Sequence, residues 1–206
     1  MNFQPLKYVY KAAENLEAST LLLLHGTGGD EKDLLPLAKN FGNHFNILSV
    51  RGNVTEQGMP RFFRRIGLGI FDEKDLKFRT DELISFIGDT ANKEGFDSTK
   101  VIALGYSNGA NIAGSMLVHY PNFLLGAILF RPMLPYKIMP EFKTDKLVKV
   151  FVSCGKSDTM VTTSEIQDYM ILLEKGNFNV ELNTLNTGHN LTEEDIELAV
   201  KWMSIF

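Results

Sequence analysis

The chain is 206 residues long and carries a formal net charge of −4, with 44% hydrophobic and 22% charged residues. This length suits one domain spanning residues 1–206, with room for a large buried core. The acidic balance argues against a nucleic-acid partner, because nucleic-acid binders usually present a basic face. The one cysteine, Cys154, excludes an internal disulfide, and no apolar run is long enough to cross a membrane. The first residues, MNFQPLKYVYKAAE, lack the pattern of a secretory signal, so we expect a cytoplasmic protein without stable membrane insertion.

Short apolar runs alternate along the chain with longer stretches of helical spacing. The expected strands are Lys7–Tyr10, Thr20–Leu24, Asn46–Val50, Val101–Gly105, Gly126–Phe130, Leu147–Ser153 and Val180–Leu185. The expected helices are Glu31–Asn43, Asp75–Lys93, Asn108–His119, Thr163–Lys175 and Thr192–Ile205. Most of the strand-length runs are continuously apolar, which is typical of strands covered on both faces. The pattern predicts an α/β fold with a mostly parallel central sheet and helices on both faces.

One segment, Arg51–Gly69, fits neither a strand nor a helix. Its sequence, RGNVTEQGMPRFFRRIGLG, holds four arginines, a proline and two adjacent phenylalanines. Long irregular stretches inside compact domains are often functional loops. An ordinary surface excursion is the other interpretation, and the sequence leaves the role of this loop open.

The pentapeptide Gly105-Tyr106-Ser107-Asn108-Gly109 stands between an expected strand and an expected helix. Ligands meet a parallel sheet at the carboxyl ends of its strands, so Ser107 lies at the edge where chemistry is expected. A tight strand-to-helix turn brings two backbone segments together, and Gly105 and Gly109 leave room because they lack a Cβ atom. This G-x-S-x-G arrangement predicts a nucleophile elbow that exposes the Ser107 hydroxyl.

A serine hydroxyl is a poor nucleophile until a nearby base takes its proton, and the base expected here is His189. Of the four histidines, it is the one that lies beyond the last expected strand. A T-x-x-D capping pattern that begins at Thr192 predicts a helix start just after it. His189 is therefore expected on a short loop at the same edge of the sheet as Ser107.

The acid of such a triad should follow an intervening strand, because the expected chain order is nucleophile, acid, histidine. Asp158 is the first carboxylate after the strand Leu147–Ser153. Asp145 precedes that strand and Asp168 lies inside an expected helix, so both fit less well. Asp158 is predicted to hold His189 in the correct tautomer and to stabilise the imidazolium as it forms.

An acyl-transfer site also needs hydrogen-bond donors for the oxyanion. One should be the backbone N–H of Asn108, the residue after the serine. The glycine-rich turn HGTGGDEKD follows the strand Thr20–Leu24, and we expect the Thr27 N–H to be the second donor. His25 is expected to orient this turn and not to transfer protons.

The same glycine-rich turn invites a phosphate-binding interpretation. It lacks both the G-x-G-x-x-G spacing and the GK[ST] ending of nucleotide-binding loops. Neither H-E-x-x-H nor C-x-x-C occurs in the chain. We therefore expect no metal and no cofactor.

Six stretches of the sequence resemble the phospholipase/carboxylesterase family of α/β-hydrolases, which also includes acyl-protein thioesterase-like enzymes. They are HGTGGDEKDLLPLA (25–38), RGNVTEQGMPRFFRR (51–65), GYSNGANIA (105–113), RPMLP (131–135), GKSDTMV (155–161) and GHNLTEEDI (188–196). The second and fourth are most similar to a bacterial subgroup of small esterase-like hydrolases, some linked to quinone or aromatic stress. The resemblance implies an α/β-hydrolase fold, a triad of Ser107, Asp158 and His189, and oxyanion donors at Thr27 and Asn108. It alone suggests a homodimer. Asn108 stands where many thioesterase-like members have glutamine, which weakens the expectation of long acyl chains.

The sequence defines the substrate pocket less sharply than the triad. The candidates for an apolar acyl or aromatic cleft are Met59, Phe62, Phe63, Met133 and Leu134. Core packing is the alternative interpretation for all five. Arg61, Arg64 and Arg65 either receive an anionic substrate group or face solvent. Too few residues separate the strands after Phe130 for a separate lid domain.

The sequence thus predicts a serine carboxylesterase that cleaves small-molecule ester substrates through an acyl-enzyme intermediate. One alternative is an acyl-thioesterase or lysophospholipase that acts on longer acyl chains. Another is a catalytically inactive binding protein on the same fold. Labelling by a fluorophosphonate and a series of esters of increasing chain length separate these possibilities.

Overall fold

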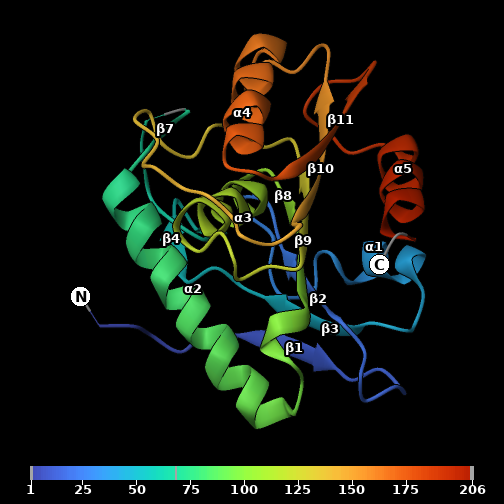
Figure 1. The fold of residues 1–206 in the computed structure, drawn as a ribbon. Helices are drawn as coiled ribbons and strands as arrows, with labels where there is room; N and C mark the ends of the chain where they lie inside the picture. The colour runs from blue at the N-terminus through green and yellow to red at the C-terminus, as the bar shows by residue number, and fades with distance from the viewer. Residues whose placement is uncertain (1, 68, 205–206) are drawn as a thin grey trace.

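The structure is a computed structural model that describes residues 2–67 and 69–204. A seven-stranded sheet lies at its centre, in the order β1-β3-β2-β8-β9-β10-β11 (Figure 1). The strands are β1 (Tyr8–Lys11), β2 (Thr20–Leu24), β3 (Asn46–Val50), β8 (Val101–Tyr106), β9 (Gly126–Phe130), β10 (Lys149–Gly155) and β11 (Asn179–Leu185). β1 runs antiparallel to β3, and every other neighbouring pair is parallel. The prediction of a mostly parallel sheet is confirmed.

Helices cover both faces of the sheet (Figure 1). One face packs against α2 (Glu73–Glu94), α3 (Asn108–His119) and α4 (Thr163–Lys175), and the other against α1 (Leu35–Ala38) and α5 (Glu193–Met203). In β2, Leu22 and Leu24 belong to the first core and Leu21 and Leu23 to the second. Because successive side chains of a strand point to opposite faces, a strand covered on both faces, such as β2, is almost entirely apolar.

The expected helix at Glu31–Asn43 is wrong in extent. The structure has only α1, at Leu35–Ala38, followed by a 3-10 turn at Lys39–Phe41. Pro36 lies in the first turn of α1, the one part of a helix that tolerates proline, so a regular helix cannot continue through it from the preceding residues. Gly42, with φ of 86°, ends the turn.

The segment Arg51–Gly69 is more regular than its sequence indicates. It contributes to two antiparallel hairpins, formed by β4 (Val54–Glu56) with β5 (Met59–Arg61) and by β6 (Arg65–Gly67) with β7 (Ile70–Phe71). Gln57 and Gly58 join the first pair with φ of 52° and 80°, the positive values that two-residue hairpin turns require. Leu68 lies outside the described residues.

The remaining helices begin and end close to their predicted positions. α3 and α4 match the prediction, and α2 is slightly longer at both ends. The helix predicted at Thr192–Ile205 is α5: Thr192 is its N-cap, accepting a hydrogen bond from Asp195 N, while Ile205 lies outside the described residues. Residues 131–148, between β9 and β10, hold neither a helix nor a strand. Within residues 2–67 and 69–204, no helix combines the length and apolar character that a membrane span needs.

Candidate active site

Ser107 lies at the turn between β8 and α3, in a backbone conformation that most residues avoid. Its φ is 52° and its ψ is −111°. The Ser107 N–H donates to the carbonyl of Phe130 in β9 (2.9 Å), and the Ser107 carbonyl accepts from Asn111 N in α3 (2.9 Å). These two bonds fix a strained residue between the sheet and the first turn of the helix.

The glycines on either side of Ser107 are required by close backbone approach. A Cβ atom on Gly109 would lie 1.9 Å from the carbonyl oxygen of Leu24 in β2. A Cβ atom on Gly105 would lie 2.5 Å from the backbone of Gly109 itself. Any side chain at either position would therefore push α3 away from the sheet and displace the serine.

The three side chains predicted as a triad form one hydrogen-bonded chain at the carboxyl edge of the sheet. His189 Nε2 lies 2.9 Å from Ser107 Oγ, and His189 Nδ1 lies 2.8 Å from Asp158 Oδ2. The Asp158 side chain is fully buried, whereas that of His189 is 24% exposed. When Nδ1–H donates to the carboxylate, Nε2 is left as the acceptor facing the serine hydroxyl. This arrangement can move a proton from the serine to the imidazole.

The loops that carry the acid and the histidine follow β10 and β11, which are paired in parallel. Ser157 N donates to the carbonyl of Thr187 (3.0 Å) and so joins the two loops. A Cβ atom on Gly155 would lie 2.2 Å from the carbonyl oxygen of Gly188. The strand pairing and this glycine contact together set the distance between the carboxylate and the imidazole.

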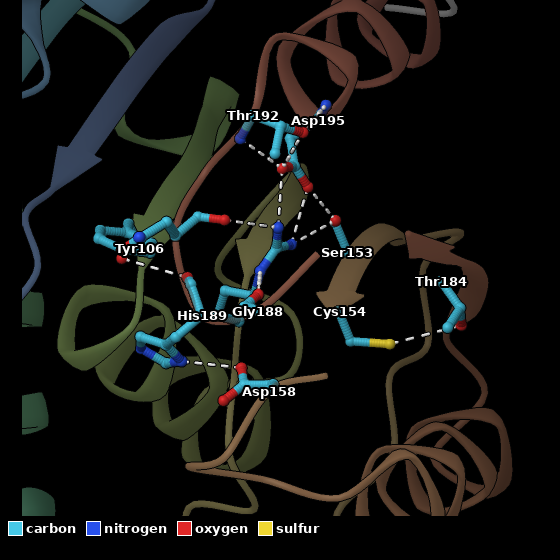
Figure 2. Close-up of polar contacts among 11 residues, drawn as sticks. Tyr106, Ser153, Cys154, Asp158, Thr184, Gly188, His189, Thr192 and Asp195 are labelled. Atoms are coloured by element: carbon cyan, nitrogen blue, oxygen red, sulfur yellow. Dashed lines mark hydrogen bonds and ion pairs between the residues drawn. The ribbon is translucent and has the colours of Figure 1, made fainter. Parts of the chain in front are cut away.

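Arg131, directly after β9, is fully buried and holds the loop around His189. Its Nε donates to the carbonyl of Gly188 (3.1 Å), and its Nη2 donates to the carbonyl of Asn190 (2.9 Å). The Tyr106 hydroxyl donates to the carbonyl of His189 itself (3.2 Å), as Figure 2 shows. Three consecutive backbone carbonyls are thus each held by a side-chain donor, which fixes the backbone that carries the imidazole.

The charge of Arg131 is balanced by Asp195 in the first turn of α5. The two groups make a bidentate pair with contacts of 2.7 and 2.8 Å, and both side chains are fully buried. The Ser153 hydroxyl accepts from Arg131 Nη1 (2.7 Å). It donates to Asp195 Oδ1 (Figure 2). Burial by itself would raise the pKa of Asp195, but hydrogen bonds from Arg131, Ser153 and Thr192 hold that pKa below its usual value. The Asp195 carboxylate is therefore ionised at neutral pH.

The glycine-rich turn after β2 is hydrogen-bonded to the segment that follows β3. Gly28 N donates to the carbonyl of Pro60 (2.9 Å), and His25 Nε2 accepts from Gly52 N (3.0 Å). His25 Nδ1 lies 2.6 Å from the carbonyl oxygen of Gly26. Burial lowers the pKa of His25, so its ring is neutral at pH 7, with one nitrogen donating and the other accepting. The His25 ring is hydrogen-bonded to these loops and not to Ser107.

Two asparagine side chains in the first turn of α3 hold the loops on either side of the serine. Asn108 Oδ1 accepts from Phe62 N (2.8 Å), and Asn111 Oδ1 accepts from Met133 N (2.7 Å). Both asparagines are buried. Sequence reasoning assigned Asn108 only a backbone role and overlooked Asn111. An asparagine in the first helical turn after the serine is the sequence signal that could have identified the roles of Asn108 and Asn111.

Comparison with known proteins places this geometry in a family. The model of the phospholipase/carboxylesterase family matches residues 8–206. The chain belongs to the phospholipase/carboxylesterase family. It is 43% identical to MhqD of Bacillus subtilis over 197 residues, which are 96% of this chain and 97% of that protein.

Solved structures of related proteins have the same fold as this family member. The carboxylesterase of Bacillus cereus is 46% identical, with a TM-score of 0.94, and the match covers 97% of this chain and 94% of that one. YahD, whose structure was solved with malic acid, is 34% identical with a TM-score of 0.91 and coverage of 98% and 99%. The chain is therefore a carboxylesterase-like hydrolase with an α/β-hydrolase fold.

In this phospholipase/carboxylesterase family member, a cavity of about 50 Å³ opens beside the serine. It is lined by Thr27, Arg61, Arg65, Gly69, Phe71, Ser107, Asn108, Asn111, Met133 and Met160. Thr27 and Asn108, whose backbone N–H groups are the predicted oxyanion donors, thus lie next to Ser107. Hollows of about 380 and 520 Å³ occur elsewhere on the molecule but share no residue with this cavity. The hydrogen-bonded serine, and not cavity size, identifies the site.

The structure separates the five residues predicted to form an apolar cleft. Met133 lines the cavity beside Ser107. Phe62 and Phe63 are 3% and 0% exposed and belong to the core, so core packing describes them instead. Met59 and Leu134 are half-buried, and neither lines the cavity. The apolar side chains of its wall are Phe71 in β7, Met133 in the segment after β9 and Met160 in the segment after β10.

Proposed function

We propose that this protein is a serine carboxylesterase that hydrolyses short esters through an acyl-enzyme intermediate. The observation that carries the proposal is the hydrogen-bonded chain from Ser107 through His189 to Asp158, with contacts of 2.9 and 2.8 Å. A nucleophile within reach of a base that is itself oriented by an acid is the arrangement that acyl transfer requires.

In the proposed mechanism, Ser107 Oγ attacks the ester carbonyl while His189 Nε2 takes its proton. Asp158 accepts from Nδ1–H and stabilises the imidazolium. The imidazolium then gives its proton to the departing alcohol, which leaves an acyl group on Ser107. A water molecule, activated by the same imidazole, repeats the attack and releases the acid. No cofactor takes part in these steps.

The backbone N–H groups of Thr27 and Asn108 are the proposed donors to the oxyanion. Both residues line the cavity with Ser107, and Asn108 begins α3, so its N–H has no partner within the helix. The Arg61 Nη1 bond to Thr27 Oγ1 (2.7 Å) supports a fixed position for the second donor. Donors fixed in this way contribute roughly 10²–10³ each to the rate.

The size of the cavity favours short esters over the substrates of a thioesterase or lysophospholipase. Its volume is about 50 Å³, whereas pockets that enclose drug-sized ligands are roughly 300–1,000 Å³. A long acyl chain would have to lie outside it. We therefore propose a small acyl group as the part of the substrate next to Ser107.

The substrate class is tested by the rates for p-nitrophenyl acetate, butyrate, octanoate and palmitate, together with palmitoyl-coenzyme A. We expect kcat/KM to be highest for acetate or butyrate and to fall along the series. A maximum at octanoate or beyond, or a preference for the thioester, would assign the protein to the runner-up activity. Rapid labelling by a fluorophosphonate probe is expected as well, and a failure to label would indicate an inactive binding protein.

Arg131→Lys is expected to lower kcat by roughly 10²-fold, the cost of a small misplacement of a catalytic group. Lysine retains a charge for Asp195, but its single ammonium group cannot hold the carbonyls of Gly188 and Asn190 as the guanidinium does. The imidazole of His189 would lose its fixed position. The measurement is the steady-state rate divided by the concentration of enzyme that reacts with a fluorophosphonate. This ratio does not depend on the fraction of the protein that is folded.

Ser153→Ala is the matched control for that variant, because it removes a hydroxyl from the same buried network without touching the loop around His189. It should lower the free energy of unfolding by about 1 kcal/mol and leave kcat close to its original value. Equal kcat values in Arg131→Lys and Ser153→Ala would show that Arg131 serves stability alone.

We further propose that residues 1–206 act as one domain in the cytoplasm. In support, one sheet holds strands that begin at Tyr8 and end at Leu185, and helices from the whole chain pack on it. Cys154, the one cysteine, is buried and free, as suits a reducing compartment. The homodimer suggested by family resemblance stays a prediction, which sedimentation measurements can test.

A further inference from the structure

Two of the three arginines in the sequence MPRFFRR line the cavity beside Ser107. The Arg61 side chain is 5% exposed and the Arg65 side chain 25% exposed, and both belong to the cavity wall. Arg64 does not line the cavity: its side chain is 51% exposed and contacts Asp75 (3.4 Å). The segment that carries these arginines therefore directs two cationic side chains toward the serine and one away from it.

The positive charge at the cavity wall exceeds the negative charge that faces it. Glu56 Oε2 lies 2.5 Å from Arg65 Nε and 3.9 Å from Arg61 Nε, and in residues 2–67 and 69–204 neither arginine forms another ion pair. Asp158 is buried behind His189 and bonded to it. The pKa of Arg61 is lowered by burial and then by the charge of Arg65. One guanidinium charge is thus left without a matching carboxylate.

Arg61 and Arg65 are held in different ways, which leaves Arg65 the better placed to meet a ligand. Arg61 donates through Nη1 to Thr27 Oγ1 (2.7 Å) and through Nε to the carbonyl of Phe63 (3.2 Å). Arg65 is anchored by the contact of its Nε with Glu56. Within the described part of the chain, its Nη1 and Nη2 atoms make no hydrogen bond. A planar guanidinium with these donors free matches the two oxygens of a carboxylate.

Building on the proposed function, we infer that the substrate is an ester with a carboxylate on its acyl part, a half-ester of a short dicarboxylic acid. The carboxylate meets Arg65, with Arg61 adding to the field, while the ester carbonyl meets Ser107. Because the cavity holds only about 50 Å³, few bonds can separate the two groups. Hydrolysis consumes one water and releases an alcohol, the dicarboxylate and one proton.

The test compares monomethyl succinate with methyl succinamate, which replaces the carboxylate by a neutral amide of the same shape. We expect kcat/KM to be roughly 10- to 100-fold higher for the charged ester, the range that a charge-assisted hydrogen bond supplies. Arg65→Gln should reduce this ratio toward 1, and Arg65→Lys should retain part of it. Arg64→Gln is the matched control, because the Arg64 side chain does not line the cavity. It should leave the ratio unchanged.

Equal kcat/KM values for the two esters in the unmodified enzyme would overturn the inference. So would an Arg65→Gln variant that lowers both rates by the same factor, because the arginine would then serve only the hairpins. In either case the rates on neutral esters would still stand as evidence for the proposed function.

If neither ester is hydrolysed, a second measurement tests the anion site directly. Calorimetric titration of Ser107→Ala with succinate reports anion binding without any turnover. Binding that weakens at least tenfold in Ser107→Ala/Arg65→Gln, but not in Ser107→Ala/Arg64→Gln, supports the anion site. Equal affinity in all three proteins overturns it, whatever the outcome for the esterase activity.

Discussion

Replacing Ser107 by alanine is expected to lower kcat for p-nitrophenyl acetate by about 10⁴–10⁶-fold without unfolding the protein. Within residues 2–67 and 69–204, the Ser107 side chain makes one hydrogen bond, to His189 Nε2. The backbone bonds that hold its strained conformation do not involve the hydroxyl. Alanine has the same Cβ atom as serine, so φ of 52° costs both residues alike. The variant is therefore expected to lose turnover and to keep its fold.

The thermal midpoint and kcat are to be measured together for this variant. Ser115→Ala is the matched control, because it removes a hydroxyl from the same helix that is buried and bonded to Thr80 (2.6 Å) and Tyr136 (2.7 Å). That control should lose stability and keep its turnover, the reverse of Ser107→Ala. Comparable turnover of p-nitrophenyl acetate by Ser107→Ala would refute the assignment of the nucleophile.

The positions of the triad residues could be predicted because each follows a strand. In a parallel sheet the carboxyl ends of the strands meet at one edge, so three residues that follow three strands are brought together whatever lies between them. The glycines at 105 and 109 carry the same kind of information. Both positions require glycine, because a Cβ atom on any other residue would clash with neighbouring backbone atoms.

Contacts between loops could not be predicted in this way. In the sequence, Arg131 stands in a motif that resembles the family and Asp195 in a capping pattern, yet together they fix the backbone around His189. Nothing local pairs two residues that are 64 positions apart. One signal was available: a charged residue directly after an all-apolar strand can be buried, and a buried charge needs a partner of opposite sign.

Apolar patterning was also an insufficient guide in two places, for different reasons. Around Pro36 it reported a buried face correctly, but the proline limits the helix to one short turn. At Phe62 and Phe63 it could not distinguish a substrate cleft from the core, because both bury aromatic rings. Arg61 and Arg65, and not the two rings, line the cavity.

Asp158→Asn is expected to lower kcat by several orders of magnitude, about 10⁴-fold by analogy with other serine hydrolases. The asparagine amide can donate to Nδ1 of His189, which would place the proton on Nε2, the atom that must accept from Ser107. Asp158 Oδ1 accepts from Met160 N (2.8 Å), a bond that the asparagine oxygen can retain. Geometry would then be preserved while the tautomer is wrong.

The two carboxylates set aside in the sequence supply the controls for this variant. Asp145 accepts a hydrogen bond from Asn122 (3.2 Å), and this bond does not involve His189. Asp168 lies on α4. Asn replacements of these two should keep the original kcat. A loss below tenfold in Asp158→Asn would mean that another acid orients His189. Because the Asp158 side chain is fully buried against the ring, such a result would require the loop after β10 to rearrange during turnover.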